Sequence, residues 1–156
     1  YPADSFSAEK QALAQRYIEQ IATNLDYVGT ITLELFEVED NLIANEVAPR
    51  VHNSGHWSIE GAVTSQFRNH MLAVTGQQIT STESRFPAAA MINVISDENP
   101  TSLASTMTKT YFHSYGKEAR PDRKLGHVTI TAQSTDERDA KISKLERLIP
   151  AGVWQK

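Results

Sequence analysis

Several kinds of chemistry are excluded by what the 156-residue chain lacks. It contains no cysteine, which excludes disulfide bonds, zinc–thiolate sites and thiol catalysis. Its uninterrupted apolar runs reach about five residues, as in Ala88–Ile92, whereas a transmembrane helix needs about 20. The N-terminus has neither the basic nor the apolar region of a signal peptide. We therefore expect a cytoplasmic protein without membrane contact.

The chain also lacks the common short motifs of nucleotide and ester chemistry. Its seven glycines form neither a GxGxxG nor a GxxxxGK[ST] loop, and no GxSxG nucleophile elbow is present. Fifteen basic residues stand against 19 acidic ones, which gives a net charge of −4. This charge speaks against a basic protein that coats nucleic acid, so we expect no nucleic-acid partner.

The spacing of apolar residues predicts a mixture of helices and hairpin-like strands. We expect helices over residues 5–25, 64–74 and 135–149 and a short one near 101–108, and strands over 28–38, 42–47, 89–95, 110–115 and 125–132. This order predicts an α+β fold or a mixed α/β fold. A polar stretch, residues 77–85, is closed by Pro87 and is the best boundary between two domains, 1–84 and 85–156.

Two glutamates form the sharpest pattern in the chain. A three-residue turn, Glu39–Asn41, would place Glu34 directly opposite Glu46 on one face of a hairpin. Like charges that face each other across strands repel by about 0.2–1 kcal/mol, and a cation between them removes that cost. Magnesium takes oxygen ligands from carboxylates and phosphates at nucleotide sites. The alternative is two glutamates on the solvent face of a sheet.

The loop that follows, residues 45–57, reads N-E-V-A-P-R-V-H-N-S-G-H-W. Arg50 can bind a small oxyanion through two parallel hydrogen bonds, and His52 can relay a proton near neutral pH. His52 and His56 have the spacing of a helical zinc pair, but Pro49 argues against a helix there. The alternative is a structured loop whose polar groups satisfy its own backbone.

A basic turn stands out in this acidic chain. Four cations fall within eight residues, at Lys117, Arg120, Arg123 and Lys124. A turn of this composition suits a phosphate group. A solvated hairpin turn is the alternative.

Taken together, these segments resemble a known family. Residues 33–36, followed by the N-E-x-A-P-R-x-H-N-S-G-H-W run, are similar to the end of an ATP-grasp domain, and more narrowly to the N5-carboxyaminoimidazole ribonucleotide synthetase family. Residues 90–93 and 115–127 fit the same family, the ATPase subunit of phosphoribosylaminoimidazole carboxylase. The resemblance implies the C-terminal part of an ATP-grasp fold (an antiparallel sheet with helices) in residues 1–84, followed by a small β-rich domain in 85–156. Family members are more than twice as long, so the chain resembles a C-terminal fragment.

The resemblance also implies an activity, that of an ADP-forming carbon–nitrogen ligase of purine biosynthesis. The enzyme would use ATP and Mg²⁺ to phosphorylate bicarbonate to carboxyphosphate, and would then carboxylate 5-aminoimidazole ribonucleotide. The full-length enzyme would be a homodimer, and the isolated fragment is expected to be inactive.

Roles for individual residues follow from the same resemblance. It implies metal ligands at Glu34 and Glu46, nucleotide contacts at Asn45 and Glu46, bicarbonate or carboxyphosphate contacts at Arg50, His52 and Asn53, and ribonucleotide-phosphate contacts at Lys117, Arg123 and Lys124. Two positions depart from the pattern. Ala48 stands where many ATP-grasp enzymes carry an asparagine, and Asp122 stands where the family usually has glycine.

Two other functions stay open on the sequence. Another ATP-grasp ribonucleotide ligase, such as a formate-dependent transformylase, would share the glutamate pair but not the A-P-R-x-H-N-S-G-H-W loop. A non-catalytic binding or assembly module could retain the remnant of an enzyme.

Overall fold

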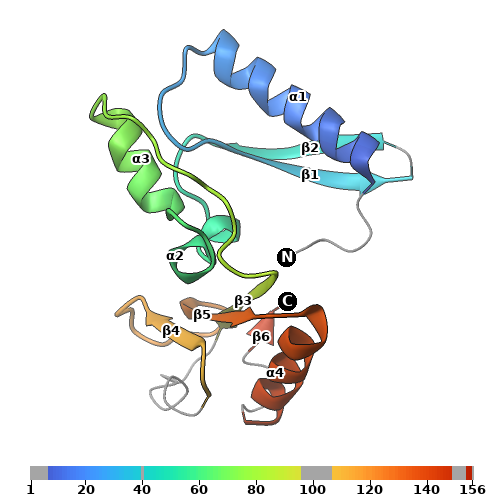
Figure 1. Cartoon of the computed structure of the whole chain (residues 1–156), viewed down its shortest axis with the longest axis vertical. Helices are drawn as coiled ribbons and strands as arrows, with labels where there is room; N and C mark the ends of the chain where they lie inside the picture. Colours follow the sequence, from blue (N-terminus) through green and yellow to red (C-terminus); the bar gives the residue numbers. More distant parts are fainter. Residues whose placement is uncertain (1–6, 40, 96–106, 149–153, 156) are drawn as a thin grey trace.

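The computed structural model describes residues 7–39, 41–95, 107–148 and 154–155. The helices are α1 (Ala8–Asn24), α2 (Ser58–Gly61), α3 (Gln66–Val74) and α4 (Thr135–Leu148), with a 3₁₀ turn at Asn53–Gly55. The strands are β1 (Thr32–Val38), β2 (Asn41–Ala48), β3 (Ala88–Ile95), β4 (Thr110–Ser114), β5 (Lys124–Ala132) and β6 (Trp154–Gln155). Figure 1 shows two separate sheets with helices beside each, which confirms the α+β class. Within the described residues, no helix is long and apolar enough to cross a membrane.

The first sheet is the β1–β2 hairpin, and α1 lies along it (Figure 1). The Ser7 side chain accepts a hydrogen bond from the Lys10 backbone N–H at 3.2 Å and caps the helix. Lys10 also joins the helix to the hairpin, because its Nζ lies 2.5 Å from Glu37 Oε1. The helix that we predicted over 5–25 is thereby confirmed, with its start set by the Ser7 cap.

The hairpin pairs Glu34 with Glu46, as predicted, but through a different turn. Val38 pairs with Asn41, so only residues 39 and 40 connect the strands, and the predicted three-residue turn is wrong. The register then shifts next to Glu34, where a β-bulge leaves Asn45 as the extra residue of β2. The bulge adds the one residue that the shorter turn lacks, so the two carboxylates still face each other.

Several other predicted boundaries need correction. The first strand begins at Thr32 instead of residue 28, and the segment predicted as pure loop contains the 3₁₀ turn at Asn53–Gly55. The short strand β6, which pairs with β3, was not predicted. The helix expected near 101–108 falls largely outside the described residues. The proposed division into 1–84 and 85–156 stays a prediction.

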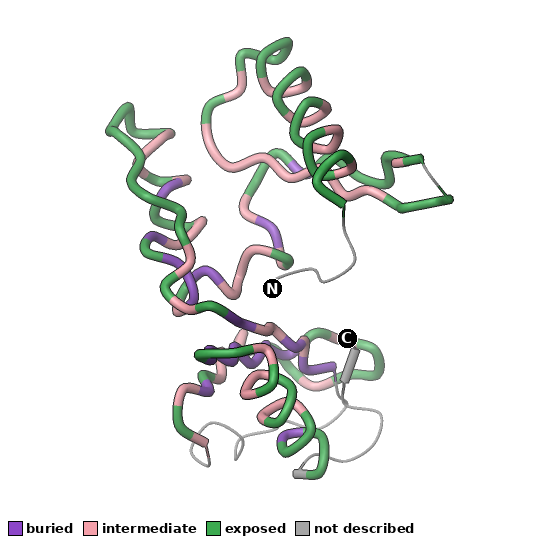
Figure 2. Tube along the Cα trace, turned by 45° about the vertical axis from the view of Figure 1, so that its right-hand side comes forward, coloured by how far each residue is buried: buried purple, intermediate pink, exposed green. Residues whose placement is uncertain are grey.

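The second sheet has the strand order β4-β5-β3-β6, and its described pairs are all antiparallel. One face packs against α4 and forms the apolar core, with the buried side chains Ile92, Val94, Val128, Ile130 and Leu145. Figure 2 shows that buried residues concentrate in this sheet, whereas α1 and the hairpin are largely exposed or half-buried. The second sheet therefore carries the main apolar core of the described structure.

The opposite face of the second sheet is polar. Asn93 of β3 pairs with His127 of β5, which pairs in turn with His113 of β4, so these three lie in one row across the sheet. Their face is turned to α2, because Glu60 Oε1 lies 2.8 Å from His113 Nε2. The segment that follows the hairpin is thus joined to the second sheet through polar side chains.

Gly126 allows the close approach of β4 and β5, which gives a testable prediction. A methyl group at Gly126 would collide with the backbone carbonyl of His113, which cannot move aside. We expect Gly126→Ala to lower the free energy of unfolding by about 2–4 kcal/mol, measured by urea denaturation. Gly116→Ala is the control, since that site has open space and only a left-handed φ of +62°. It should cost about 1–2 kcal/mol, and an equal or larger loss there would contradict the steric explanation.

Candidate functional site

The facing carboxylates are surrounded by polar groups of the bulge and of the following loop. Asn45 Nδ2 donates to Glu34 Oε2 at 3.1 Å, and His52 Nε2 lies 3.1 Å from Glu34 Oε1. Arg50 Nη2 lies 3.6 Å from Glu46 Oε1. Each carboxylate thus has a nitrogen-bearing partner that offsets the repulsion between them. Five residues that the sequence singled out are brought together here.

The His52 segment is held by a side chain that sequence analysis missed. Gln66, the first residue of α3, accepts a hydrogen bond from the His52 backbone N–H at 3.0 Å and donates to the His52 carbonyl at 2.7 Å. The Gln66 amide lies where a side chain at Gly55 would project, so a larger residue there would displace it. Ser54 Oγ lies 2.9 Å from His52 Nδ1 and leaves Nε2 for Glu34. This clamp explains why a loop without regular periodicity presents a fixed imidazole.

The carboxylate pair suits a hard cation that is shared with phosphate groups. Among the described residues, no three His, Asp, Glu or Cys side chains converge in a way that could hold a metal by themselves. Two carboxylates that face each other across a hairpin fit magnesium when phosphate oxygens supply the other ligands. Ala48, which is buried, contributes no oxygen from its side chain. A zinc site at His52 and His56 is not supported, because His56 contacts Gln66 instead.

Asn53 connects this region to the basic turn of the second sheet. Lys124, the first residue of β5, places its Nζ 3.4 Å from Asn53 Oδ1. The Asn53 side chain also hydrogen-bonds the hydroxyl of Tyr115, which follows β4. The predicted bicarbonate segment and the predicted phosphate segment therefore meet, although they are 71 positions apart.

The rest of the basic turn divides into two groups. Lys117 Nζ lies 5.2 Å from the centre of the Tyr115 ring, so this cation belongs to the same cluster as Asn53. Arg123 instead donates to the Glu118 carbonyl at 3.3 Å, and the structure does not bring it to the other site residues. Asp122 has a φ of +57°, a left-handed conformation that glycine would adopt without strain.

A group of aromatic side chains beneath Asn53 was not predicted. Tyr115 Oη lies 2.9 Å from His127 Nδ1, and the rings of His113 and His127 stack with centroids 4.6 Å apart. The His56 ring lies 5.2 Å from that of His127. We call these four residues the histidine–tyrosine cluster. The residue types are visible in the sequence, but the register of β4 against β5 and the packing of the His56 loop on the second sheet bring them together.

Burial controls protonation in this cluster. Desolvation, together with the neighbouring His113 and His56, lowers the pKa of His127 from 6.5 to about 4. Desolvation lowers the pKa of His56 and raises the pKa of the Tyr115 hydroxyl. Because unfolded His127 binds a proton near pH 6.5 and folded His127 only near pH 4, it makes the protein less stable as the pH falls between these values.

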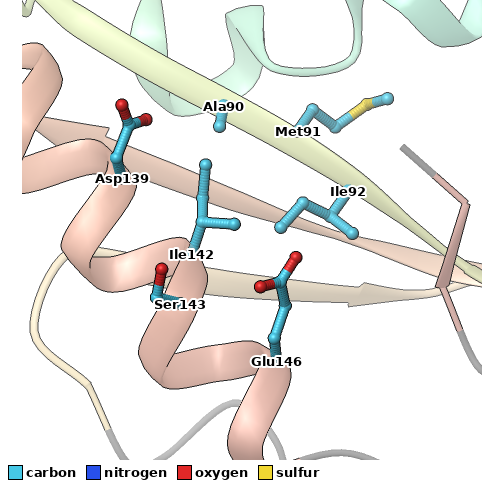
Figure 3. A pocket seen from close by; sticks show the side chains of 7 residues that line it. All are labelled: Ala90, Met91, Ile92, Asp139, Ile142, Ser143 and Glu146. Carbon is cyan, nitrogen blue, oxygen red and sulfur yellow. The ribbon is translucent and has the colours of Figure 1, made fainter. Parts of the chain in front are cut away.

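A separate hollow of about 380 Å³ lies between β3 and α4, on the apolar side of the second sheet (Figure 3). It is lined by Ala90, Met91, Ile92, Asp139, Ile142, Ser143 and Glu146. The sequence-predicted site residues take no part in it. Its two carboxylates make it unsuitable for a phosphate or bicarbonate anion.

Comparisons with known proteins agree with this arrangement. Residues 1–67 match the model of the ATP-grasp domain, and residues 89–141 match that of the phosphoribosylaminoimidazole carboxylase C-terminal domain. The N5-carboxyaminoimidazole ribonucleotide synthase of Pseudomonas aeruginosa is 44% identical over 141 residues, which is 90% of this chain and 39% of that protein. The homologue of Escherichia coli is 39% identical over 145 residues, 92% of this chain and 40% of that protein.

Solved structures give the same result. The crystal structure of N5-carboxyaminoimidazole ribonucleotide synthetase from Thermus thermophilus superposes with a TM-score of 0.88 at 42% identity, over 99% of this chain and 42% of that one. The enzyme from Aspergillus clavatus, in complex with ADP and 5-aminoimidazole ribonucleotide, superposes with a TM-score of 0.80 at 32% identity, over 94% of this chain and 42% of that one.

The first part of the chain is similar to the ATP-grasp domain, and the facing carboxylates lie within the matched residues. More narrowly, the chain is similar to members of the N5-carboxyaminoimidazole ribonucleotide synthase family, including their C-terminal domain. It spans about two fifths of the length of the curated relatives that it matches.

Proposed function

We propose that the protein contributes the C-terminal part of an enzyme that carboxylates 5-aminoimidazole ribonucleotide with bicarbonate and ATP. The products would be N5-carboxyaminoimidazole ribonucleotide, ADP and phosphate. The observation that carries the proposal is the contact between Lys124 and Asn53, because it brings the candidate phosphate segment to the candidate bicarbonate segment. The names of the relatives and the ribonucleotide complex of the Aspergillus clavatus enzyme support the same substrates.

The first half-reaction transfers the terminal phosphoryl group of ATP to bicarbonate. Glu34 and Glu46 would hold magnesium, which neutralises charge on the phosphates when it is bound. Asn45 lies beside this pair and would contact the nucleotide. Arg50, at 3.6 Å from Glu46, would bind the bicarbonate anion next to the phosphoryl group. Transfer between two anions depends mainly on such positioning and charge neutralisation.

The second half-reaction joins the carboxyl carbon to the amine of the ribonucleotide. Lys117 and Lys124, in the basic turn, would bind the ribonucleotide phosphate, with Arg123 as a further candidate. Asn53 and His52 would hold the carboxyphosphate within reach of the amine. Carboxyphosphate hydrolyses readily, so the parts of the enzyme outside this chain must exclude water from the site.

The test of the proposed function is the fate of labelled bicarbonate. The full-length enzyme is incubated with ATP, magnesium, 5-aminoimidazole ribonucleotide and ¹³C-bicarbonate, and the products are followed by NMR. We expect ¹³C in a carbamate on the ribonucleotide, in equal amount to ADP. Label in no product, or activity with formate in place of bicarbonate, would reject the assignment and favour a transformylase. A homodimeric assembly and a cytoplasmic location remain predictions from the family resemblance.

Substituting a lysine of the basic turn should change the KM for one substrate more than the KM for the others. We expect Lys117→Ala or Lys124→Ala to raise the KM for the ribonucleotide about tenfold or more, because a phosphate dianion loses a charge-assisted hydrogen bond. The KM for ATP should change less than twofold. Lys144→Ala, an exposed lysine on α4, is the matched control and should change neither value. Equal effects on both substrates would reject the phosphate-binding role.

A further inference from the structure

Tyr115 contacts three residues that matter for the proposed function. Its hydroxyl lies 2.9 Å from His127 Nδ1 and is hydrogen-bonded to the side chain of Asn53. Its ring lies 5.2 Å below the Lys117 ammonium. One half-buried side chain therefore touches a candidate bicarbonate residue and a candidate phosphate residue at the same time.

The hydrogen bonds through Tyr115 join Asn53 to His127. Burial raises the pKa of Tyr115, so its hydroxyl keeps its proton and can donate. The hydrogen bond from Asn53 acts in the opposite sense and lowers that pKa, which is the effect of an amide N–H that donates to the phenol oxygen. The Asn53 carbonyl oxygen is then the atom that faces Lys124 Nζ at 3.4 Å. Lys124 donates to Asn53, and the chain of hydrogen bonds continues through Tyr115 to His127.

His127 provides a fixed end for this chain of hydrogen bonds. Only 2% of the residue is exposed, and it lies in β5, between β3 and β4. Its ring stacks on His113, and His113 Nε2 lies 2.8 Å from Glu60 Oε1 of α2. His127 remains neutral near pH 7, and its Nδ1 forms the hydrogen bond with the Tyr115 hydroxyl at 2.9 Å.

We propose that Tyr115, anchored on His127, is a positioning residue that orients the Asn53 amide and the Lys117 ammonium toward their substrates. The proposal rests on the proposed function and adds two residues to its site. An unrestrained asparagine can present either its oxygen or its nitrogen to an anion. The hydrogen bond to Tyr115 fixes the orientation of the Asn53 amide. The contact with the Tyr115 ring restricts the positions that the Lys117 ammonium can take.

The two contacts of Tyr115 can be separated by substitution in the full-length enzyme. Tyr115→Phe removes the hydroxyl but keeps the ring under Lys117. We expect it to raise the KM for bicarbonate about tenfold, while the KM values for the ribonucleotide and for ATP change less than twofold. Tyr115→Leu removes both contacts and should raise the KM for the ribonucleotide as well. Tyr111→Phe, on the preceding strand β4, is the matched control and should change none of these values.

A second pair of variants tests the anchor. The side-chain oxygen of asparagine can replace Nδ1 of histidine, so His127→Asn should keep the bicarbonate KM within threefold of the wild-type value. In His127→Leu, the leucine side chain cannot form a hydrogen bond with Tyr115, so this variant should reproduce the effect of Tyr115→Phe. Combining Tyr115→Phe with His127→Leu should add no further loss in bicarbonate KM, because both changes remove the same hydrogen bond. Thermal unfolding of each variant shows whether it is folded at the assay temperature.

The outcomes distinguish this inference from the proposed function. If Asn53→Ala impairs bicarbonate use and Tyr115→Phe does not, the positioning role is wrong and the function stands. If Tyr115→Phe changes the KM values for all substrates equally, its role is structural and the inference is again overturned. If Asn53→Ala and Glu46→Ala both leave turnover unchanged, the proposed function itself fails.

Discussion

Replacing Glu46 with alanine in the full-length enzyme should lower bicarbonate-dependent ATP hydrolysis about a hundredfold to a thousandfold. Glu46 faces Glu34 across the hairpin, and a magnesium–nucleotide complex would lose half of its protein carboxylates. The fold should be nearly unchanged, because the Glu46 side chain is about half exposed and its removal also relieves repulsion. Phosphate release at saturating magnesium measures the first effect, and urea denaturation measures the second.

Glu37→Ala is the matched control for this experiment. Glu37 lies on the same strand as Glu34 and is similarly exposed, but it pairs with Lys10 of α1. Its removal should leave turnover within twofold of wild type. If Glu46→Ala were as active as Glu37→Ala at saturating magnesium, the facing carboxylates would have no metal-binding role.

The 156-residue chain alone should fold and yet show at least a hundredfold less turnover than the full-length enzyme. Folding is expected because the second sheet and α4 enclose an apolar core that includes Val94, Ile130 and Leu145. Low turnover is expected because the chain spans only about two fifths of the length of its relatives. Catalysis requires reactants to be held at near-attack distance and shielded from water.

Circular dichroism and phosphate release, measured on the same preparation, test this second prediction. A helical, cooperatively unfolding chain without turnover agrees with it. Turnover within tenfold of the full-length enzyme would show that the chain is sufficient for catalysis. A chain without helical signal would show that its core depends on the remaining sequence.

The parts of the fold that depend on local sequence were predicted well. Helices were predicted over 5–25 and 64–74; in the structure the side-chain caps Ser7 and Ser65 set their starts at Ala8 and Gln66, and Gly76, predicted to stop the second helix, follows α3 with a φ of +69°. Such signals act within one helical turn, so they can be read from a single sequence. The facing pair, Glu34 and Glu46, was also predicted, although the turn was wrong. The bulge at Asn45 compensated for the shorter turn, and no local rule predicts a bulge.

The parts that depend on packing between distant segments were missed. His113, Tyr115 and His127 appear in the sequence as scattered aromatic residues of two strands and a turn. Their cluster exists because β4 pairs with β5 in one register, which a single sequence does not determine. The clamp of Gln66 on His52 spans 14 positions and involves an ordinary polar residue at a helix start. Sequence reasoning therefore found the residues that would touch substrates more readily than those that hold them in place.

The binding of ADP as a function of magnesium is the most direct test that the facing carboxylates form a metal–nucleotide site. Isothermal titration calorimetry of the full-length enzyme, with and without magnesium, would compare wild type with Glu34→Ala, Glu46→Ala and the Glu37→Ala control. We predict that magnesium tightens ADP binding to wild type and to Glu37→Ala at least tenfold, and that Glu34→Ala and Glu46→Ala lose most of this gain. The same magnesium dependence in all four proteins would contradict the account.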